Sequence, residues 1–596
     1  IDVIKKALKF VDKVIVGISD GNQKNFLFSI DETLAPGGPD PGLLGCYLYE
    51  ADGSGGYTLV WHFITPEPGN SLPGMHYGDI DGDQLHEIYF GVPPASGSND
   101  ETWGTYIFEQ AADGSFPSQP TLLFRYGMET ADNFRPAGFD LADVDGDGKV
   151  ELCTVDRGGR RLSIDALTGD GLDGFASFTN EFLAGGTTGD LAGVLDGGGI
   201  YNLDIADTDA DGLHEVWVNT WNGFSMTIFE ATGADSYVMA SDINAIFPDG
   251  DPGSFRRSGF AFNDVDGDQD LDAWFPMTDG KLYFYHNTAL DSVGPNALTN
   301  GGVESGTEGW GFYPDPASNM DVVGTGETMF NTDSTFTAFE GDSALKIWGL
   351  YTGAASENNA FFAYEGDNAI APGTHFHLSA EFYTNSADDL SQGASKGVLF
   401  AKYFGPGYAW IGMQSVDFVG AAPDEWHHKD LHCAVPQGTA IVQVGVMHVQ
   451  PSNDDHGSFY VDDLQMMPVV TEGVGQIADS DFHEVLRFGL RNRGSDMGDI
   501  DGDGKPDIIA TTGTHETVVR MEYMGGDPTN EANYAVSTIF ESKGEPGDRF
   551  YPVDISDSDL DGDGNHEVVL TNLYASNPDQ PQIFVANHQS YFDIFA

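Results

Sequence analysis

The nine residues Asp143-Val-Asp-Gly-Asp-Gly-Lys-Val-Glu151 hold the pattern around which the rest of the chain is organised. Carboxylates stand at positions 1, 3, 5 and 9, and glycines stand at positions 4 and 6. Glycine supplies the backbone angles of a tight loop at no steric cost. Because a strand-like run, Glu151-Leu-Cys-Thr-Val, begins at position 9, the pattern predicts an acidic turn inside a β-sheet.

The same pattern occurs six times along the 596 residues. Calcium takes six to eight oxygen ligands, so alternate acids, one backbone carbonyl at position 7 and a closing acid suit it. An EF-hand would close at position 12 and continue as a helix, whereas these copies close at position 9 and continue as strands. The predicted calcium ligands are Asp79, Asp81, Asp83, Leu85 and Glu87; Asp143, Asp145, Asp147, Lys149 and Glu151; Asp207, Asp209, Asp211, Leu213 and Glu215; Asp264, Asp266, Asp268, Asp270 and Asp272; Asp499, Asp501, Asp503, Lys505 and Asp507; and Asp559, Asp561, Asp563, Asn565 and Glu567.

The spacing of the copies predicts the architecture. From one motif start to the next the steps are 64, 64, 57, 235 and 60 residues. A unit of about 60 residues fits one four-stranded propeller blade with long loops. Six motifs, with an N-terminal segment that reads as a blade without the loop, predict an all-β chain containing a seven-bladed β-propeller. The long step predicts an inserted domain of about 175 residues.

Acidic loops that each open a strand at blade-sized intervals resemble the FG-GAP/VCBS repeats of bacterial surface proteins and of integrin α-subunits. The resemblance covers about 1–290 and 472–596 and implies a calcium-binding propeller outside the cell. The predicted organisation is a basic segment at 1–13, the first part of the propeller at 14–292, an inserted module at 296–470, and the remainder of the propeller at 472–596.

The inserted segment has its own signatures. It opens with Asn300-Gly-Gly-Val-Glu-Ser-Gly-Thr-Glu-Gly-Trp310 and closes with Gly457-Ser-Phe-Tyr-Val-Asp-Asp463. It resembles the jelly-roll carbohydrate-binding modules of cellulases and xylanases. That resemblance implies a β-sandwich with a structural calcium, for which the matching positions are Glu304, Glu340, Asp342 and Asp463.

Sugar binding by such a module needs exposed aromatic faces for the pyranose rings. The alternatives are that the aromatic residues are core, and that the module acts as a spacer or a protein-contact domain. The candidate glycan-binding residues are Trp310, Trp348, Tyr351, Tyr403, Tyr408 and Trp410.

Composition limits the partners. The chain has 94 acidic and 25 basic residues, a net charge of −69, which disfavours nucleic acid and anionic membrane. The carboxylates either ligate cations or solvate a protein from a salty habitat.

Three scattered cysteines build no disulfide framework, and Cys46 and Cys153 in apolar runs are expected to be buried free thiols.

The first 13 residues carry four lysines, with Ile1, Ile4, Leu8 and Val11 at helical spacing. This pattern predicts a short basic amphipathic helix. It is either a local latch onto the acidic propeller or an arm that docks into another copy of the chain.

No zincin helix, nucleophile elbow or phosphate-cradling loop occurs in the sequence, and no carboxylate pair stands out as catalytic. We therefore expect a non-enzymatic, extracellular or cell-surface calcium protein that binds a glycan or a surface protein. The alternatives are a self-assembling subunit of a surface filament or layer, and a calcium-dependent polysaccharide-degrading enzyme.

Overall fold

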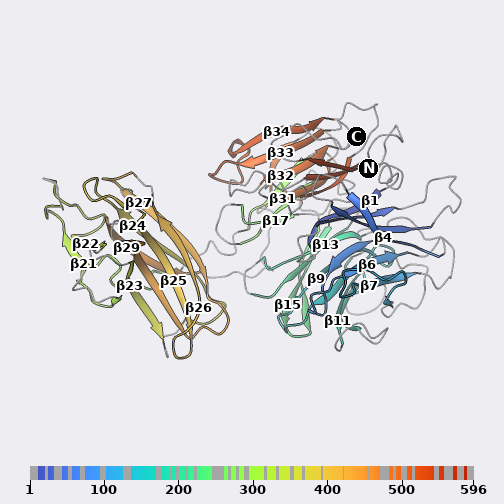
Figure 1. The fold of residues 1–596 in the computed structure, drawn as a ribbon, viewed down its shortest axis with the longest axis horizontal. Helices are drawn as coiled ribbons and strands as arrows, with labels where there is room; N and C mark the ends of the chain where they lie inside the picture. The colour runs from blue at the N-terminus through green and yellow to red at the C-terminus, as the bar shows by residue number, and fades with distance from the viewer. Residues whose placement is uncertain are drawn as a thin grey trace. The chain divides into compact units, whose positions relative to one another are not determined.

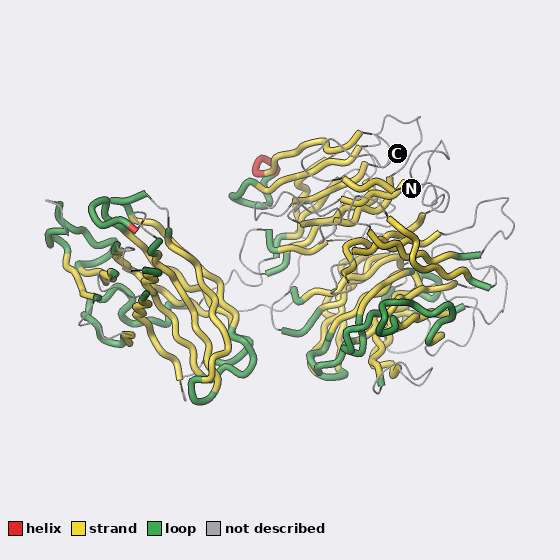
Figure 2. Tube along the Cα trace, in the orientation of Figure 1, coloured by secondary structure: helices red, strands yellow, loops and turns green. Residues whose placement is uncertain are grey.

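A computed structural model shows an all-β chain, in which strands dominate (Figure 2). The residues it describes include a short 3-10 helix, Glu531–Asn533, and no helix among them is long and apolar enough to cross a membrane. The structure describes residues 11–19, 25–31, 43–51, 57–66, 74–93, 103–124, 136–168, 178–186, 191–195, 200–208, 212–220, 225–244, 261–265, 270–276, 281–287, 294–313, 319–329, 334–349, 355–365, 370–390, 394–419, 422–452, 457–469, 482–487, 492–498, 507–512, 517–541, 550–555, 568–572 and 583–586.

The chain forms two compact units. Unit 1 contains Ile1–Asn287 and Gly473–Ala596, and unit 2 contains Thr288–Glu472. The inserted module predicted at 296–470 lies within unit 2.

Unit 1 consists of antiparallel sheets built from strands that follow one another along the chain (Figure 1). The first three sheets contain β1 Val11–Ser19, β2 Asn25–Asp31, β3 Gly45–Ala51 and β4 Tyr57–Ile64; β5 Met75–Gly78, β6 Glu87–Val92, β7 Gly104–Glu109 and β8 Leu122–Phe124; and β9 Pro136–Ala142, β10 Glu151–Asp156, β11 Arg161–Leu167 and β12 Phe178–Gly185.

Four further sheets complete the described part of unit 1. In the second of these four, the strand order shows that unit 2 enters between the third and fourth strands. The sheets contain β13 Ile200–Ala206, β14 Glu215–Thr220, β15 Ser225–Gly233 and β16 Ser236–Asn244; β17 Ala261–Asn263, β18 Asp272–Pro276, β19 Lys281–Tyr285 and β30 Phe482–Arg487; β31 Asn492–Gly498, β32 Asp507–Thr512, β33 Thr517–Tyr523 and β34 Tyr534–Glu541; and β35 Phe550–Ile555, β36 Val568–Asn572 and β37 Ile583–Ala586.

Neighbouring sheets of unit 1 pack face to face through apolar side chains. Val155 and Ile164 of the third sheet share a core with Val216 and Phe229 of the fourth. Strand β10 is buried along its whole length because both faces of its sheet are covered. Cys46 and Cys153 are buried free thiols, as predicted.

Contacts between first strands link the sheets in chain order. Strand β5 contacts β9, β9 contacts β13, β17 contacts β31, and β31 contacts β35. Strand β1 contacts both β5 and β35, so the last sheet of the chain meets the first. The fourth and fifth sheets meet where Trp217 packs against Phe262, with 5.2 Å between ring centroids.

The N-terminal helix prediction is wrong where the structure tests it. Val11, Asp12 and Lys13 belong to strand β1, which pairs with β2 from Val11 onward. Backbone hydrogen bonds to β2 outweigh the helical spacing of the apolar residues, because apolar residues an even number of positions apart also share one face of a strand. Residues 1–10 lie outside the described residues.

Unit 2 is a β-sandwich of two five-stranded antiparallel sheets (Figure 1). Its core includes Leu399 and Val444 from one sheet and Phe376, Phe382 and Phe459 from the other. In strand order the sheets are β20 Gly311–Tyr313, β23 Ser356–Glu365, β28 Ile441–Gln450, β25 Lys396–Gly405 and β26 Ala409–Phe418; and β21 Met320–Gly324, β22 Ser343–Trp348, β29 Ser458–Pro468, β24 His375–Tyr383 and β27 Trp426–Ala434.

Candidate metal centre

The acidic loops join the first and second strands of their sheets. The loop Asp143–Glu151 connects β9 to β10, and its closing acid, Glu151, pairs with Ala142 at the start of the ladder. Glu87 pairs with Gly78 in the same way. The described closing acids Glu215, Asp272 and Asp507 also begin the second strand of a sheet. The sheet therefore holds position 9 of each of these loops in one place.

Backbone geometry explains the glycines of the motif. Gly146 and Gly148, at positions 4 and 6, have φ of +73° and +88°, in the left-handed region that favours glycine. In the first loop Gln84 occupies position 6 with φ +70°. At both loops the amide of position 6 donates to the position-1 aspartate, over 2.9 Å to Asp79 and 3.1 Å to Asp143.

Each of the closing acids Glu87 and Glu151 has a hydrogen bond to one of its two carboxylate oxygens and none to the other. Oε2 of Glu87 accepts the Ile80 amide at 2.9 Å, and Oε2 of Glu151 accepts the Val144 amide at 2.8 Å. Both side chains are buried, and Oε1 of each has no hydrogen-bond partner among the described residues. A buried carboxylate oxygen without a partner is costly unless a cation or donor compensates it.

Each of these acids belongs to a group of three carboxylates whose oxygens lie within 4.8 Å of one another. The groups are Asp79, Asp81 and Glu87, and Asp143, Asp145 and Glu151. Burial, together with nearby aspartates, raises the pKa of Glu87 to about 8 and that of Glu151 to about 8. An all-oxygen donor set with this charge suits a hard divalent cation such as calcium.

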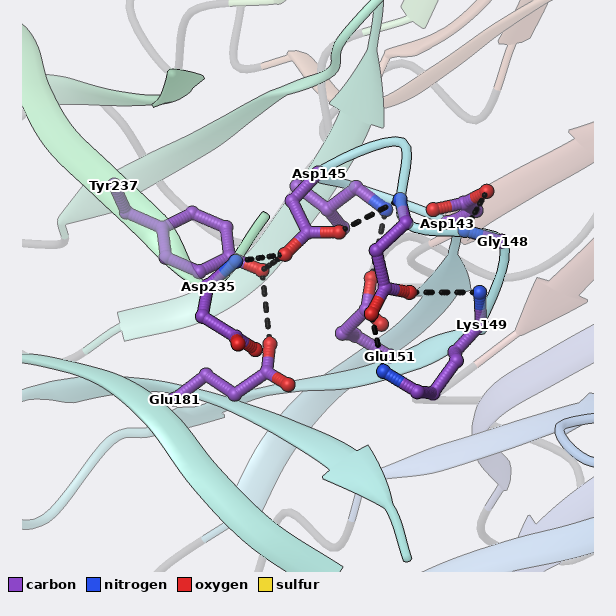
Figure 3. Close-up of polar contacts among 10 residues, drawn as sticks. Asp143, Asp145, Gly148, Lys149, Glu151, Glu181, Asp235 and Tyr237 are labelled. Atoms are coloured by element: carbon purple, nitrogen blue, oxygen red, sulfur yellow. Dashed lines mark hydrogen bonds and ion pairs between the residues drawn. The ribbon is translucent and has the colours of Figure 1, made fainter. Parts of the chain in front are cut away.

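A second acidic group adjoins the loop of β9 and β10 (Figure 3). Oxygens of Asp145, Glu181 and Asp235 lie within 4.8 Å of one another. Asp145 Oδ2 accepts the Asp235 amide at 2.5 Å and the Tyr237 hydroxyl at 3.3 Å, and that hydroxyl also donates to Glu181 Oε2 at 3.1 Å. Burial and the adjacent Asp235 raise the pKa of Glu181 to about 7.

These added acids were not predicted from the sequence. Glu181 lies on β12, while Asp235 and Tyr237 lie in the β15–β16 hairpin of the next sheet. Glu109, at the end of β7, similarly joins Asp81 and Asp83. No spacing rule links these residues to the motif, because only the packing of strands brings them to it.

The remaining loops are described in part. Gly212 donates to Asp207 at 3.0 Å, Thr208 donates to the closing acid Glu215 at 2.6 Å, and Val265 donates to Asp272 at 3.1 Å. Leu213, Asp264 and Asp270 are also described. The predicted ligands Asp209, Asp211, Asp266, Asp268, Asp499, Asp501, Asp503, Lys505, Asp559, Asp561, Asp563, Asn565 and Glu567 lie outside the described residues.

Asp507 is buried and has a protein cation beside it. Its Oδ1 lies 2.6 Å from Nε of Arg520, a residue of β33. The closing acid of the fifth loop therefore differs from Glu87 and Glu151, since an arginine already neutralises it.

In unit 2 the predicted ligands Glu304, Glu340, Asp342 and Asp463 are all described, but no three of their carboxylates lie close enough together to share an ion. Asp463 has φ +47° beside a bulge in β29, and its Oδ2 accepts Gln465 Nε2 at 2.7 Å on the outer face of the sheet. The neighbouring Asp462 is the buried acid that meets this segment, since its Oδ2 accepts the amides of Phe339 and Glu340 at 2.9 and 3.1 Å. Glu304 Oε1 accepts the amides of Asp342 and Ser343.

Two of the predicted glycan-binding aromatics are core residues, which corrects the prediction for them. Trp310 is 8% exposed and donates Nε1–H to the carbonyl of Asn300, and Tyr403 is 1% exposed and donates to Gln414. Their faces are covered by the sandwich core, so no sugar ring can stack there.

The other aromatic candidates differ in exposure. Tyr408 and Trp410, at the β25–β26 hairpin, are 53% and 59% exposed, and both pack against Phe404. Trp348 is half-buried beside Lys346, and Tyr351 lies outside the described residues.

No protein-family model matches the chain, and no curated protein matches it by sequence. Among solved structures, a family 16 carbohydrate-binding module is 17% identical, with coverage of 29% of this chain and 99% of its own and a TM-score of 0.20. The CBM22-1 xylan-binding domain from Paenibacillus barcinonensis is 13% identical, with coverage of 30% and 99% and a TM-score of 0.21. A cyclase from Fischerella sp. TAU is 13% identical, with coverage of 30% and 100% and a TM-score of 0.23. TM-scores this low establish no common fold across the chain.

Proposed function

We propose that this chain is a non-enzymatic, extracellular calcium-binding protein in which metal in the acidic loops stabilises unit 1 and unit 2 binds a ligand. The observation that carries the calcium assignment is the pair of buried oxygens Glu87 Oε1 and Glu151 Oε1. Each lies in a group of three carboxylates and has no hydrogen-bond partner among the residues described. A divalent cation would compensate both the burial and the mutual repulsion of the acids.

Calcium fits these loops better than magnesium. Calcium accepts a flexible shell of six to eight oxygens, whereas magnesium requires near-ideal octahedral geometry and keeps several waters. The position-3 and position-5 aspartates are already oriented by local amide bonds, as in the 3.0 Å bond from the Asp147 amide to Asp145. We expect dissociation constants of about 10⁻⁴–10⁻³ M, the range of extracellular modules.

Calorimetric titration of the chelated full chain tests this assignment. Calcium should bind at several sites per chain, and magnesium at the same concentration should give much weaker heats. Absence of calcium binding, or equal binding of the two ions, would contradict the proposal.

We further propose that the sheets of unit 1 form the seven-bladed propeller that the FG-GAP resemblance implies. Three features support it. The strands of each sheet follow one another along the chain, with unit 2 entering between β19 and β30. First strands touch between most neighbouring sheets, and β1 contacts β35. A ring of this kind leaves few free sheet edges, which protects a long β-chain from aggregation.

For unit 2 we propose glycan binding through Tyr408 and Trp410. These two exposed aromatic rings on one hairpin, which both pack against Phe404, offer apolar faces against which a pyranose can stack. The Tyr408 hydroxyl already donates to Glu365 at 3.2 Å, which fixes that ring.

A glycan array with the full chain tests ligand binding. Trp410→Ala should abolish binding to the glycans that the parent protein retains, whereas Tyr313→Ala, which removes another exposed aromatic of the same sheet, should not. If Trp410→Ala bound the same glycans as the parent protein, the glycan site would not be at this hairpin. An activity screen on the bound glycans distinguishes a binder from a polysaccharide-degrading enzyme, since product release would favour the enzyme.

A further inference from the structure

A second group of acids lies beside the loop of β9 and β10 and joins two sheets of unit 1. It consists of Asp145 from the loop, Glu181 from β12 and Asp235 from the turn between β15 and β16. The three side chains point toward one another, and oxygens of all three lie within 4.8 Å of one another (Figure 3). The loop acids Asp143 and Glu151 form a separate group with Asp145, so Asp145 belongs to both groups.

The protein compensates the charges of this second group poorly. Among the residues that the structure describes, no lysine or arginine pairs with Glu181 or Asp235. The Tyr237 hydroxyl lies 3.3 Å from Asp145 Oδ2 and 3.1 Å from Glu181 Oε2. A hydroxyl has one proton, so it cannot satisfy both carboxylates at once. Carboxylates this close repel one another unless a cation lies between them.

A buried oxygen beside this group also indicates a cation. Glu151 is 0% exposed, and its Oε1 has no hydrogen-bond partner among the described residues. Burial raises the pKa of Glu151 to about 8, and the charges of Asp145, Glu181 and Asp143 add to this effect in that order. Glu181 therefore acts on Glu151 more strongly than the loop residue Asp143 does. A fully buried carboxylate oxygen without a partner requires a compensating charge, and both groups of acids adjoin this one.

An ion held by the loop acids would not also be held by Glu181 and Asp235. Oxygens bound to one calcium lie at most about 5 Å apart, because each is about 2.3–2.6 Å from the ion. Asp143 and Glu151 lie outside the group that contains Glu181 and Asp235. The two groups together contain five carboxylates, and one divalent ion compensates only two of their charges. Two ions fit this arrangement better, since the two oxygens of Asp145 allow it to bridge them.

We propose that two calcium ions share Asp145 at this junction. One is held by the loop acids Asp143 and Glu151, and the other by Glu181 and Asp235. This inference rests on the calcium site proposed for the loop and adds to it a site that no nine-residue motif contains. Asp235 is exposed, so water reaches the second ion and completes its shell of oxygens. The second ion connects β12 with the β15–β16 hairpin, so its binding holds the third and fourth sheets together.

Equilibrium dialysis of the full chain against radioactive Ca²⁺ counts the bound ions. The double variant Glu181→Gln, Asp235→Asn removes two charges from the second group only and should bind one ion fewer per chain than the parent protein. Asp145→Asn removes the shared acid and should lower the count by two. Glu181 is half-buried and Asp235 is exposed, so their replacement by amides of the same shape should leave unit 1 folded.

The matched control is Glu308→Gln, Glu531→Gln, which removes two exposed carboxylates elsewhere and should keep the full count. In crystals soaked with Tb³⁺, anomalous scattering should give two peaks beside Asp145 in the parent protein and only the loop peak in the double variant.

Three results would overturn the second ion alone and leave the loop sites standing. These are an unchanged count in the double variant, an equal loss in the control, and a single peak beside Asp145 in the parent protein. A parent protein that binds no calcium would contradict the loop sites and the second ion together.

Discussion

Glu151 is a single residue that connects the sheet to the acidic loop. Its backbone pairs with Ala142 in the ladder, and its Oε2 accepts the Val144 amide within the loop. Its Oε1 remains buried beside Asp143 and Asp145. The position-9 acid therefore fixes the loop with one oxygen, and its other oxygen is the one that a cation in this loop would bind.

Replacing this acid should cost the site its metal. Glu151→Gln keeps the shape of the side chain but removes one charge from the ligand set, so calcium affinity at this loop should fall more than about tenfold. Calorimetry should then show one fewer site per chain in the accessible range. Glu308→Gln makes the same change at an exposed position of unit 2 and should leave the stoichiometry unaltered. An unchanged isotherm for Glu151→Gln would exclude this acid as a ligand.

Asp165, on β11, provides a pH-dependent effect away from the metal loops. It is buried, and burial raises its pKa from 3.8 to about 7 although Ser163 and Asn180 donate hydrogen bonds to it. Between these values the folded chain holds a proton that the unfolded chain lacks. Raising the pH through this window therefore lowers the free energy of unfolding.

The Asp165→Asn variant should lose that dependence. The difference between the two pKa values corresponds to roughly 4 kcal/mol, an upper estimate for the change from pH 4 to pH 7. Urea denaturation at saturating calcium, repeated across this range, measures it. If the parent and variant curves run parallel, Asp165 does not titrate as its burial implies.

At the scale of elements, the loop after β9 is joined to the hairpin of the next sheet. Asp145 Oδ2 accepts the Asp235 amide and the Tyr237 hydroxyl, so a loop carboxylate bridges two sheets (Figure 3). The His214 amide also donates to the Val144 carbonyl at 2.9 Å. Ordering of the loop by metal would therefore also order the contact between these sheets.

Tyr237→Phe tests this connection. The variant leaves Asp145 and Glu181 without the hydroxyl donor, and it should destabilise unit 1 by about 1–2 kcal/mol, since hydrogen bonds to charged groups are among the stronger ones. Urea denaturation at saturating calcium is the measurement. Tyr408→Phe removes a similar bond to Glu365 at an exposed site and should change stability little. Equal effects of the two variants would indicate that the bridge between sheets contributes nothing.

At the scale of the whole molecule, the net charge of −69 destabilises the compact state through repulsion between acids, which bound cations would reduce. Each filled site adds about 2.7 kcal/mol when free calcium is 100 times its dissociation constant. In unit 1, carboxylates gather closely enough to share an ion, and among the described acids no such group lies in unit 2.

Chelation should therefore lower the melting temperature of unit 1 by many degrees and that of unit 2 much less. Differential scanning calorimetry of the full chain with and without a calcium chelator measures both transitions. Sodium chloride added to the chelated protein screens general repulsion but cannot fill the loops, so it should restore only part of the loss. Full recovery of the unit 1 melting temperature in salt, or an unchanged melting temperature on chelation, would count against specific metal sites.

The sequence by itself determined the local chemistry of this protein. Alternate acids and glycines at fixed positions specify a tight acidic turn, as the left-handed Gly146 and Gly148 show. The same local pattern placed the strands that follow Glu87 and Glu151. These features depend on residues within nine positions of one another.

Tertiary structure alone decided which distant residues meet. It brought Glu181, Asp235 and Tyr237 to the loop and placed Asp462, not Asp463, against the amide of Phe339. It also buried Trp310 and Tyr403 while leaving Trp410 exposed. It also aligned His432 with His375 and His377 across two strands. Strand register and sheet packing set these contacts, and neither is encoded by the spacing of any one motif.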